Sequence, residues 1–566
     1  MDTTRHLIIH GHFYQPPREN PWTERIERQR SAAPYHDWNE RITRECYLPN
    51  TRSRRLDGYG RITRIVNNYE WISFNFGATL LSWLEETHRE VYEKILEADR
   101  ASAARLGGHG NAIAQAYNHI IMPLANRRDQ ETQIIWGRRD FERRFGREPE
   151  GLWLPETAIN DETLSMVIGA GFSFLVLAPS QAESVRSLEK RSRWTDVSGG
   201  SIPTGCPYRC FDPSGGREHI DIFFYDQHLS HDVSFEHLLR SGDALAETIS
   251  HAYPRVKGDL VVVATDGENY GHHEPFADMA LAYLVDEGAS KKGFDFTNFG
   301  AYLESSPPTY EVRLKKGRAG EGTSWSCVHG VGRWKEDCGC NTGAPSGWNQ
   351  AWRSPLRKGL NELRDALALT FEKEGSSLLE DPWQARNDYI EVIENRTPEV
   401  SETFVSGHAT RPLDRDERAR AMSLLESQRN ALLMFTSCGW FFNDISGIET
   451  VQLLMYAARA IELSGDDSLE KMLLKHLAGA KSNIAAVGTG ADLYRDVTRG
   501  TTMNVPALVA QHAIYSYLFG PDESLEIFSH YFEPGETRET EFDDPVLRLG
   551  SVDVTSPYTL DERRWA

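Results

Sequence analysis

Short apolar runs alternate with amphipathic stretches through the first half of the chain. Six of these runs have the length and the β-branched or aromatic content of buried strands. They are LIIHGHF, WISFNF, GLWL, FSFLVL, HIDIFFY and LVVVAT. Several intervening segments instead place their apolar residues at helical spacing, and these are 78–99, 129–145, 234–252 and 274–289. Alternation of this kind predicts a mostly parallel sheet, either open or closed.

The pattern changes near residue 306, where a Pro-containing turn and a basic run precede a stretch rich in Gly, Cys and Trp, SWSCVHGVGRWKEDCGC. That composition is typical of irregular structure. Apolar residues then return at helical spacing, before a C-terminal stretch rich in Glu, Asp, Pro and Thr. We therefore predict four parts. They are a βα domain over 1–305, an irregular connecting segment over 306–350, a helical domain over 351–535 and an extended tail over 536–566.

Composition limits the classes of partner. The 566 residues are 40% hydrophobic, which is enough for two or three buried cores. The formal net charge of −21 opposes binding to nucleic acid or to an anionic membrane, so neutral substrates are the more natural ligands. No apolar run reaches the roughly 18 to 20 residues of a spanning helix, and the N-terminal run is too short for a signal peptide. We therefore expect a cytoplasmic protein, and the sequence leaves its oligomeric state open.

Two carboxylates lie where apolar runs end. Glu156 follows GLWLP, and Asp266 ends LVVVATD. In a βα barrel, the strands open onto the active-site face at such positions. Trp153 would give Glu156 an apolar wall, which raises the pKa of a carboxyl group. Each residue also has a purely structural interpretation, because Glu156 fits the first turn of a helix and Asp266 fits a capping position.

Polar side chains gather at the ends of two predicted strands. His10 and His12 are two residues apart on one strand, so their side chains point to the same face. Such a pair can bind a divalent metal, donate hydrogen bonds to sugar hydroxyls, or belong to a core. The strand that ends at Asp266 is followed by GENYGHHEP, which supplies Glu268 and His273.

Four motifs, in this order, closely resemble those of glycoside hydrolase family 57. They are HGHFYQPP, GHGNAIAQAYNHIIMPLA, GLWLPETA and ATDGENYGHHEP. The resemblance implies an α/β fold in which an incomplete seven-stranded βα barrel is followed by a helical domain. It places the nucleophile at Glu156 and the acid/base at Asp266. A weaker match, LLMFTSCGWFFNDISGIETVQ, implies that Trp440 of the helical domain reaches the substrate.

The implied function is that of a retaining carbohydrate-active enzyme, which acts on α-glycosidic bonds of the α-glucan type by double displacement. Its partner is an oligo- or polysaccharide, and it needs no cofactor and no metal ion. In this chemistry one carboxylate attacks the anomeric carbon and a carboxyl group about 5 to 5.5 Å away protonates the leaving oxygen. Because the family contains hydrolases and transferases, the motifs do not decide whether water or a sugar hydroxyl takes the second step.

The helical domain is expected to complete the substrate cleft. The expected substrate contacts are His10, His12, His119, Trp153, Glu268, His273, Trp440 and Asp444. The chain departs from the well-known members of the family in the stretch 325–340 and in the FFND that follows Trp440. Fold and mechanism therefore transfer better than substrate.

The cysteines raise a separate question. Cys327, His329, Cys338 and Cys340 offer one nitrogen and three sulfurs, a set suited to tetrahedral zinc. Their spacing differs from that of a common zinc finger, and thiols also pack as small hydrophobes, so the sequence leaves zinc binding open. Cys206 and Cys210, in CPYRC, are expected to be loop thiols. Seven cysteines, an odd number, do not make a disulfide framework.

Two other functions stay open. The first is a metal-dependent carbohydrate enzyme, deacetylase-like or similar to zinc α-mannosidases, with His10, His12 and Asp266 as ligands. It leaves Glu156 without a role, and the first motif is His-x-His rather than the His-x-Asp of those mannosidases. The second is a catalytically silent glycan-binding module, which the presence of both carboxylates disfavours.

Overall fold

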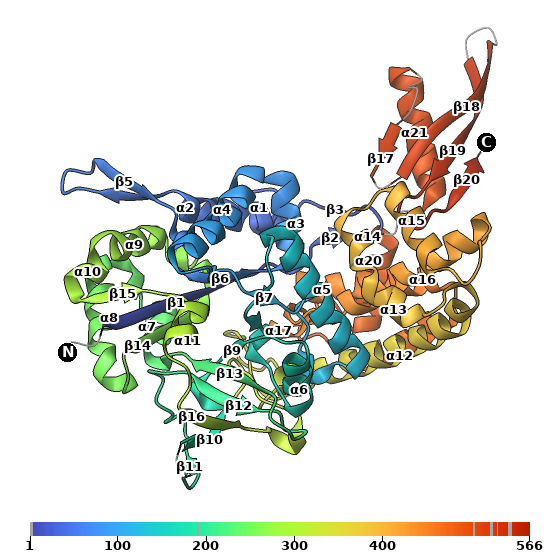
Figure 1. Ribbon diagram of the computed structural model, residues 1–566. Helices are drawn as coiled ribbons and strands as arrows, with labels where there is room; N and C mark the ends of the chain where they lie inside the picture. Colours follow the sequence, from blue (N-terminus) through green and yellow to red (C-terminus); the bar gives the residue numbers. More distant parts are fainter. Residues whose placement is uncertain are drawn as a thin grey trace. The chain divides into compact units, whose positions relative to one another are not determined.

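The computed structural model describes residues 4–189, 192–501, 504–520, 525–528, 530–541 and 546–565. The chain divides into two compact units (Figure 1). The first comprises Met1–Pro16 and Arg28–Arg333, and the second comprises Pro17–Glu27 and Trp334–Ala566. The division after Arg333 falls inside the connecting segment predicted for 306–350.

Seven parallel strands form the centre of the first unit. They are β1 (Arg5–Phe13), β6 (Ser73–Phe76), β7 (Ala114–Gln115), β8 (Leu152–Trp153), β9 (Phe174–Leu177), β13 (His219–Phe224) and β14 (Leu260–Asp266). Their order is β14, β1, β6, β7, β8, β9, β13, with single bridges linking β6 to β7 and β8 to β9. The two ends of this series meet through a hydrogen bond from Asp226 N to Val262 O (2.7 Å), and no strand pairing joins them in the described residues. This arrangement confirms the predicted incomplete seven-stranded barrel.

The apolar runs form strands because both of their faces are buried. In β14, all residues from Leu260 to Thr265 are buried and only the terminal Asp266 is exposed. A strand that is covered on both sides reads as a continuous apolar run rather than an alternating one. Its side chains share one core with those of the neighbouring strands, including Ile8, Val176 and Phe223.

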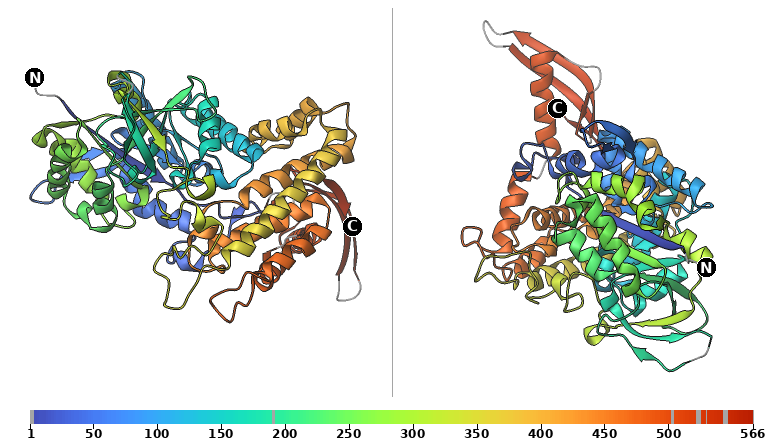
Figure 2. Two further views of the ribbon diagram at one scale, coloured as in Figure 1. Left: turned by 90° about the horizontal axis from the view of Figure 1, so that it is seen from below. Right: turned by 90° about the vertical axis from the view of Figure 1, so that its left-hand side faces the viewer.

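Helices and short connections surround these strands (Figures 1 and 2). The helices are α1 (Trp38–Ile42), α2 (Leu48–Thr51), α3 (Ala78–Thr87), α4 (Arg89–Arg105), α5 (Arg127–Phe145), α6 (Asp161–Gly169), α7 (Gln227–Phe235), α8 (Gly242–Val256), α9 (Ala277–Tyr283), α10 (Ala289–Lys292) and α11 (Phe299–Ser305). Several begin at a polar cap, as α5 does where the Asn126 side chain accepts a hydrogen bond from Asp129 N. Gly146, in the left-handed conformation (φ 67°), then ends α5.

Shorter strands extend the barrel. They are β4 (Ser53–Leu56), β5 (Ile62–Val66), β10 (Ala182–Ser187), β11 (Thr195–Asp196), β12 (Tyr208–Phe211), β15 (Phe294–Phe296) and β16 (Tyr310–Leu314). Four of them continue the sheet beyond β13 in the order β12, β16, β10, β11. Strand β15 pairs with the N-terminal part of β1, and β4 pairs with β5.

The second unit is mainly helical. Its helices are α12 (Arg353–Leu378), α13 (Pro382–Asp388), α14 (Ile390–Glu394), α15 (Pro398–His408), α16 (Arg415–Leu433), α17 (Cys438–Phe441), α18 (Ile448–Ser464), α19 (Ser468–Leu477), α20 (Gly490–Thr501) and α21 (Val505–Phe519). The short strands β2 (Glu19–Asn20) and β3 (Arg25–Ile26) belong here, and Glu24 between them pairs with Arg429 (3.0 Å). None of the described helices has the length and apolar character needed to span a membrane.

A small antiparallel sheet ends the chain. Its strands are β17 (Leu525–Ile527), β18 (His530–Glu541), β19 (Val546–Thr555) and β20 (Glu562–Trp565). Helix α21 lies beside this sheet, where Leu508 joins a core with Phe532 and Val552 (Figures 1 and 2). The stretch 536–566, predicted as an extended tail, therefore contains paired strands.

Candidate active site

The two candidate carboxylates lie at the same end of the barrel. Glu156 follows β8 and Asp266 ends β14, so both are at the carboxyl ends of parallel strands. Glu156 adopts a left-handed backbone conformation (φ 58°, ψ 20°), as does Thr157 (φ 50°). Such conformations cost free energy in non-glycine residues and persist where the surroundings enforce them. Here Gln181 holds Thr157, accepting from its Oγ1 (2.9 Å) and donating to its carbonyl (2.8 Å).

One carboxylate oxygen of Glu156 accepts two hydrogen bonds. The donors to Oε2 are the indole Nε1 of Trp325 (2.9 Å) and the hydroxyl of Ser326. Trp325 N also donates to the Glu156 carbonyl (3.0 Å). Burial raises the pKa of Glu156, while these side-chain donors and the charge of Arg333 lower it, and the net shift is upward. The carboxylate is thus fixed in place, and its ionised form is partly stabilised.

The segment that carries these donors is tied to the barrel. Thr323 and Ile159 exchange two backbone hydrogen bonds, each of 3.0 Å. The side chain of Gln181, which also holds Thr157, donates to the Thr323 carbonyl (3.3 Å). Sequence reasoning did not find that Ser326 and Trp325 donate hydrogen bonds to Glu156. The unusual SWSC stretch is the signal that marks both.

Asp266 has the opposite environment. Asp266 is exposed at the end of its strand, but the surrounding protein desolvates its carboxyl group, and the charges of two other carboxylates act on it. Burial, followed by the charges of Glu268 and Glu156, raises the pKa of Asp266 to about 8. In the described residues, the hydrogen bonds to Asp266 reach its backbone carbonyl, from Thr265 Oγ1 and Asn269 Nδ2, and not its carboxylate. The protonated form is therefore favoured at neutral pH.

Glu268 lies beside this group and is buried. Its Oε1 accepts from the Tyr47 hydroxyl (2.6 Å) and from Tyr14 N (3.1 Å). Burial nevertheless raises the pKa of Glu268 to about 7. The nearby His273 is accessible to solvent, and its backbone N donates to the Glu268 carbonyl (3.0 Å). Partial desolvation of its ring, together with the charge of His272, lowers the pKa of His273. Whether either side chain contacts substrate stays a prediction.

His10 and His12 both contact the side-chain amide of Asn75. His10 Nε2 lies 3.1 Å from Asn75 Oδ1, and His12 Nδ1 lies 2.9 Å from Asn75 Nδ2. His12 Nε2 is 3.0 Å from His119 Nε2, which requires one ring to donate and the other to accept. Burial is the main cause that lowers the pKa of His10 and His12 to about 3 and that of His119 well below its usual value. All three rings are therefore neutral at physiological pH.

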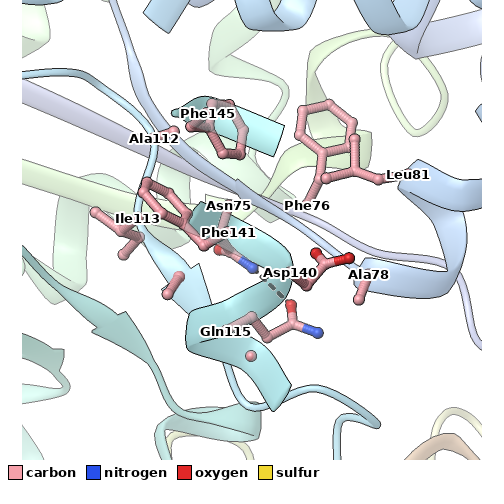
Figure 3. Close-up of a pocket in the computed structure, with 12 residues that line it drawn as sticks. Asn75, Phe76, Ala78, Leu81, Ala112, Ile113, Gln115, Asp140, Phe141 and Phe145 are labelled. Carbon is pink, nitrogen blue, oxygen red and sulfur yellow. Dashed lines mark hydrogen bonds between the residues drawn. The ribbon is translucent and has the colours of Figure 1, made fainter. Parts of the chain in front are cut away.

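The Asn75 side chain is in turn held by Gln115. Its Nδ2 donates to Gln115 Oε1 (2.7 Å), and Figure 3 shows the two amides pointing toward each other from β6 and β7. A cavity of about 20 Å³ lies here, lined by β6, β7, α3 and α5, with Asp140 at its edge (Figure 3). This volume holds roughly one water molecule and no sugar.

Trp153 lies beneath the histidines. It is fully buried, and the rings of His10 and His12 stack on it at 4.8 and 5.0 Å. The edge of Trp325 meets it at 5.2 Å. These contacts favour a role in which Trp153 supports the imidazoles, and direct stacking on a sugar stays a prediction.

The two site residues predicted in the helical unit have local partners. Trp440 is fully buried, and the Arg357 guanidinium lies 4.0 Å from its ring centre. The Asp444 carboxylate accepts from Ser482 Oγ (2.8 Å) and Asn483 N (2.6 Å). Burial raises the pKa of Asp444, but such bonds outweigh it and the net shift is downward. Both side chains stabilise the loop around α17, and their contact with substrate stays a prediction.

The alternative metal centre lacks the necessary geometry. Within the described part of the chain, His10, His12 and Asp266 do not form a group whose ligand atoms could share one ion. His10 instead places Nδ1 near Ser73 Oγ (3.0 Å) and Nε2 near Asn75. Glu156, which that alternative leaves unused, is held by two hydrogen bonds on Oε2.

Comparison with known proteins locates related chains. A family model described as "Glycosyl hydrolase family 57" matches residues 7–308, and one described as "Domain of unknown function (DUF3536)" matches residues 348–566. Alpha-amylase 1 of Dictyoglomus thermophilum is 27% identical over 115 residues. That match covers 20% of this chain and only 16% of the amylase.

A solved structure shares the fold. An exo-type maltose-forming amylase from Pyrococcus sp. ST04 matches with a TM-score of 0.63 and 14% identity, over 91% of this chain and 94% of that one. A branching enzyme of family 57 from Thermococcus kodakaraensis matches with a TM-score of 0.49 and 13% identity, over 90% and 96% of the two chains. The family 57 model covers more than half of the sequence, as the four motifs predict, and the chain therefore belongs to glycosyl hydrolase family 57.

Proposed function

We propose that this protein is a retaining enzyme that acts on α-glucans, with Glu156 as nucleophile and Asp266 as acid/base. The observation that carries the proposal is the contrast between two carboxyl groups at one end of one barrel. Glu156 receives two hydrogen bonds on Oε2, whereas the pKa of Asp266 is raised to about 8. A pair of carboxyl groups whose pKa values are pushed apart is the arrangement needed for a nucleophile and an acid. The amylases among the related proteins support the substrate class.

In the first step, Asp266 donates its proton to the glycosidic oxygen while Glu156 attacks the anomeric carbon. The bond from that carbon to the leaving sugar breaks, and a glycosyl ester forms on Glu156. The two donors hold Oε2, so they also keep the other oxygen of Glu156 directed for attack. A fixed geometry of this kind lowers the entropic part of the barrier.

In the second step, the roles at Asp266 reverse. Esterification removes the negative charge of Glu156, which is one cause of the raised pKa of Asp266. The pKa of Asp266 then falls, and its carboxylate takes a proton from water or from a sugar hydroxyl. The oxygen of the deprotonated water or hydroxyl attacks the anomeric carbon, and the ester bond to Glu156 breaks. The neutral imidazoles of His12 and His119 are suited to hydrogen bonds with sugar hydroxyls, because they offer donors and acceptors without charge.

The test uses a small anion in place of the missing carboxylate. Glu156→Ala and Asp266→Ala are each given an aryl α-maltoside, whose leaving group needs little acid, together with azide. Azide replaces the nucleophile in the first variant and yields the β-glycosyl azide, with inverted configuration. In the second variant azide attacks the glycosyl ester and yields the α-glycosyl azide.

Variants that keep the shape of each side chain but remove its carboxyl group measure how much each carboxyl group contributes to the rate. Glu156→Gln and Asp266→Asn should each lose at least about a thousandfold in turnover of an α-glucan, on the order of 4 kcal/mol of barrier. Circular dichroism checks that both remain folded. Near-normal turnover in either variant, or azide products of the opposite configurations, contradicts the assignment.

A further inference from the structure

The segment that supplies the donors to Glu156 has little regular structure. Between β16 and α12, the described residues form only two short 3₁₀ helices, η10 (Arg318–Gly320) and η11 (Gly332–Trp334). A stretch of this length without strands or helices is uncommon in a compact protein and calls for another source of order. The sequence is also dense in cysteine here, with three of the seven thiols.

Four side chains of this stretch come together. They are Cys327, His329, Cys338 and Cys340, and their ligand atoms all lie within 4.8 Å of one another. Around a tetrahedral zinc, bonds of about 2.0 to 2.3 Å place ligand atoms about 3.5 to 3.8 Å apart. A contraction of about 1 Å would therefore close the shell, and all four ligands come from one continuous stretch of chain.

Packing alone does not account for the cluster. Thiols that serve as small hydrophobes are buried, and Cys327 is, but Cys338 and Cys340 are half-buried and His329 is exposed. The structure has all seven cysteines as thiols rather than disulfides. Three thiols and an imidazole, of which Cys327 is buried and the other groups are accessible, form a soft donor set that suits Zn²⁺ and does not suit Mg²⁺ or Ca²⁺.

We propose that Cys327, His329, Cys338 and Cys340 bind one zinc ion with a structural role. Four protein ligands fill the tetrahedral shell and leave no position for water or substrate, as in structural rather than catalytic zinc sites. The backbone already shapes this stretch. Gly330 N donates to the Cys327 carbonyl (3.0 Å) and closes a turn that contains both Cys327 and His329. At the last of the four ligands, Arg353 Nη1 donates to the Cys340 carbonyl (2.9 Å).

Zinc binding would also restrict the segment that donates hydrogen bonds to Glu156. Cys327 directly follows Ser326, whose hydroxyl donates to Glu156. Fixing Cys327 therefore restricts the chain that carries both donors. This consequence rests on the proposed function, whereas zinc binding itself does not.

The first measurement is metal content. The full chain, purified without a histidine tag, is analysed by mass spectrometry of its metals, and about one zinc per chain is expected. The double variant Cys338→Ser/Cys340→Ser should lose that zinc, whereas Cys206→Ser, a half-buried thiol outside the cluster, should keep it. Replacement of zinc by Co²⁺ should give the visible absorption of a tetrahedral site with thiolate charge-transfer bands.

Each result either supports or overturns the proposal. If the double variant fails to fold, the cobalt spectrum of the wild-type chain decides. Wild-type protein that holds only trace metal after growth with zinc, and shows no thiolate charge-transfer band with Co²⁺, overturns it. Zinc that stays bound in a folded double variant also overturns it. Because these readouts do not use turnover, they stay separate from any failure of the proposed function.

Discussion

The raised pKa of Asp266 can be tested by removing one neighbouring charge. Glu268 is the largest charge contribution to that shift after burial. Glu268→Gln keeps a carbonyl oxygen that can still accept from the Tyr47 hydroxyl and Tyr14 N, so the local geometry should survive. Glu268 has a pKa of about 7 and is mostly ionised where Asp266 titrates. The variant therefore removes a full charge at the relevant pH.

Coulomb's law gives the expected size of the effect. Two unit charges roughly 7 Å apart in an effective dielectric of about 20 interact with about 2 kcal/mol. At about 1.4 kcal/mol per unit, this corresponds to one to two pKa units. The folded-state pKa of Asp266 is raised, so the proton needed for catalysis is present below pH 8 and is lost as the pH rises through 8. In Glu268→Gln that loss should begin at about pH 6 to 7.

The assay is the pH dependence of kcat/KM, which reports the free enzyme, with a substrate whose leaving group needs protonation. Wild-type kcat/KM should fall about tenfold per pH unit above pH 8, and the variant should show the same slope from the lower pH. Asp278→Asn is the control, because Asp278 is another buried carboxyl of this unit but is not among the causes of the Asp266 shift. An alkaline limb that is the same in Glu268→Gln and wild type, or that moves in the control, shows that the charge of Glu268 does not raise the pKa of Asp266.

Three further predictions follow from single contacts. Ser326→Ala removes a donor that lowers the pKa of Glu156, so the acidic limb of the pH profile should move to higher pH, and Ser326→Thr should restore it. Asn75→Ala removes the buried hydrogen-bond partner of His12 Nδ1 and Gln115 Oε1 and should lower the free energy of unfolding by about 1 to 3 kcal/mol in urea titrations, whereas an unchanged midpoint would show that the network contributes nothing. Trp440→Ala should cost about 3 to 5 kcal/mol in stability because Trp440 is fully buried, and if substrate affinity falls while stability does not, Trp440 is a substrate contact instead.

The sequence predicts those parts of the fold that depend on local pattern. Strand β14 is buried on both faces, so its continuous apolar run stands out, and its end at Asp266 follows directly. The spacing of His10 and His12 correctly predicts that they share a face, since both contact Asn75. By contrast, β7 and β8 have two residues each, which is too short for any periodicity.

Other features depend on contacts between distant residues. Ser326 reaches Glu156 across 170 positions, and no local pattern encodes that pairing. Strand β18 of the C-terminal sheet, HYFEPGETRETE, is largely polar, so it lacks the apolar alternation that marks a half-buried strand. The aromatic ring of Trp153 suggests a sugar platform in the sequence, yet its burial beneath two imidazoles becomes visible only once the strands are assembled.

The proposed retaining mechanism requires that Glu156 form a covalent bond to the sugar. The direct measurement uses an activated fluorosugar of α configuration, which forms the glycosyl ester faster than the ester is hydrolysed. Mass spectrometry of the intact protein should show one added sugar per chain, and peptide mapping should place it on Glu156. An active enzyme that gives no such adduct, or an adduct on any other residue, contradicts the assignment of Glu156 as nucleophile.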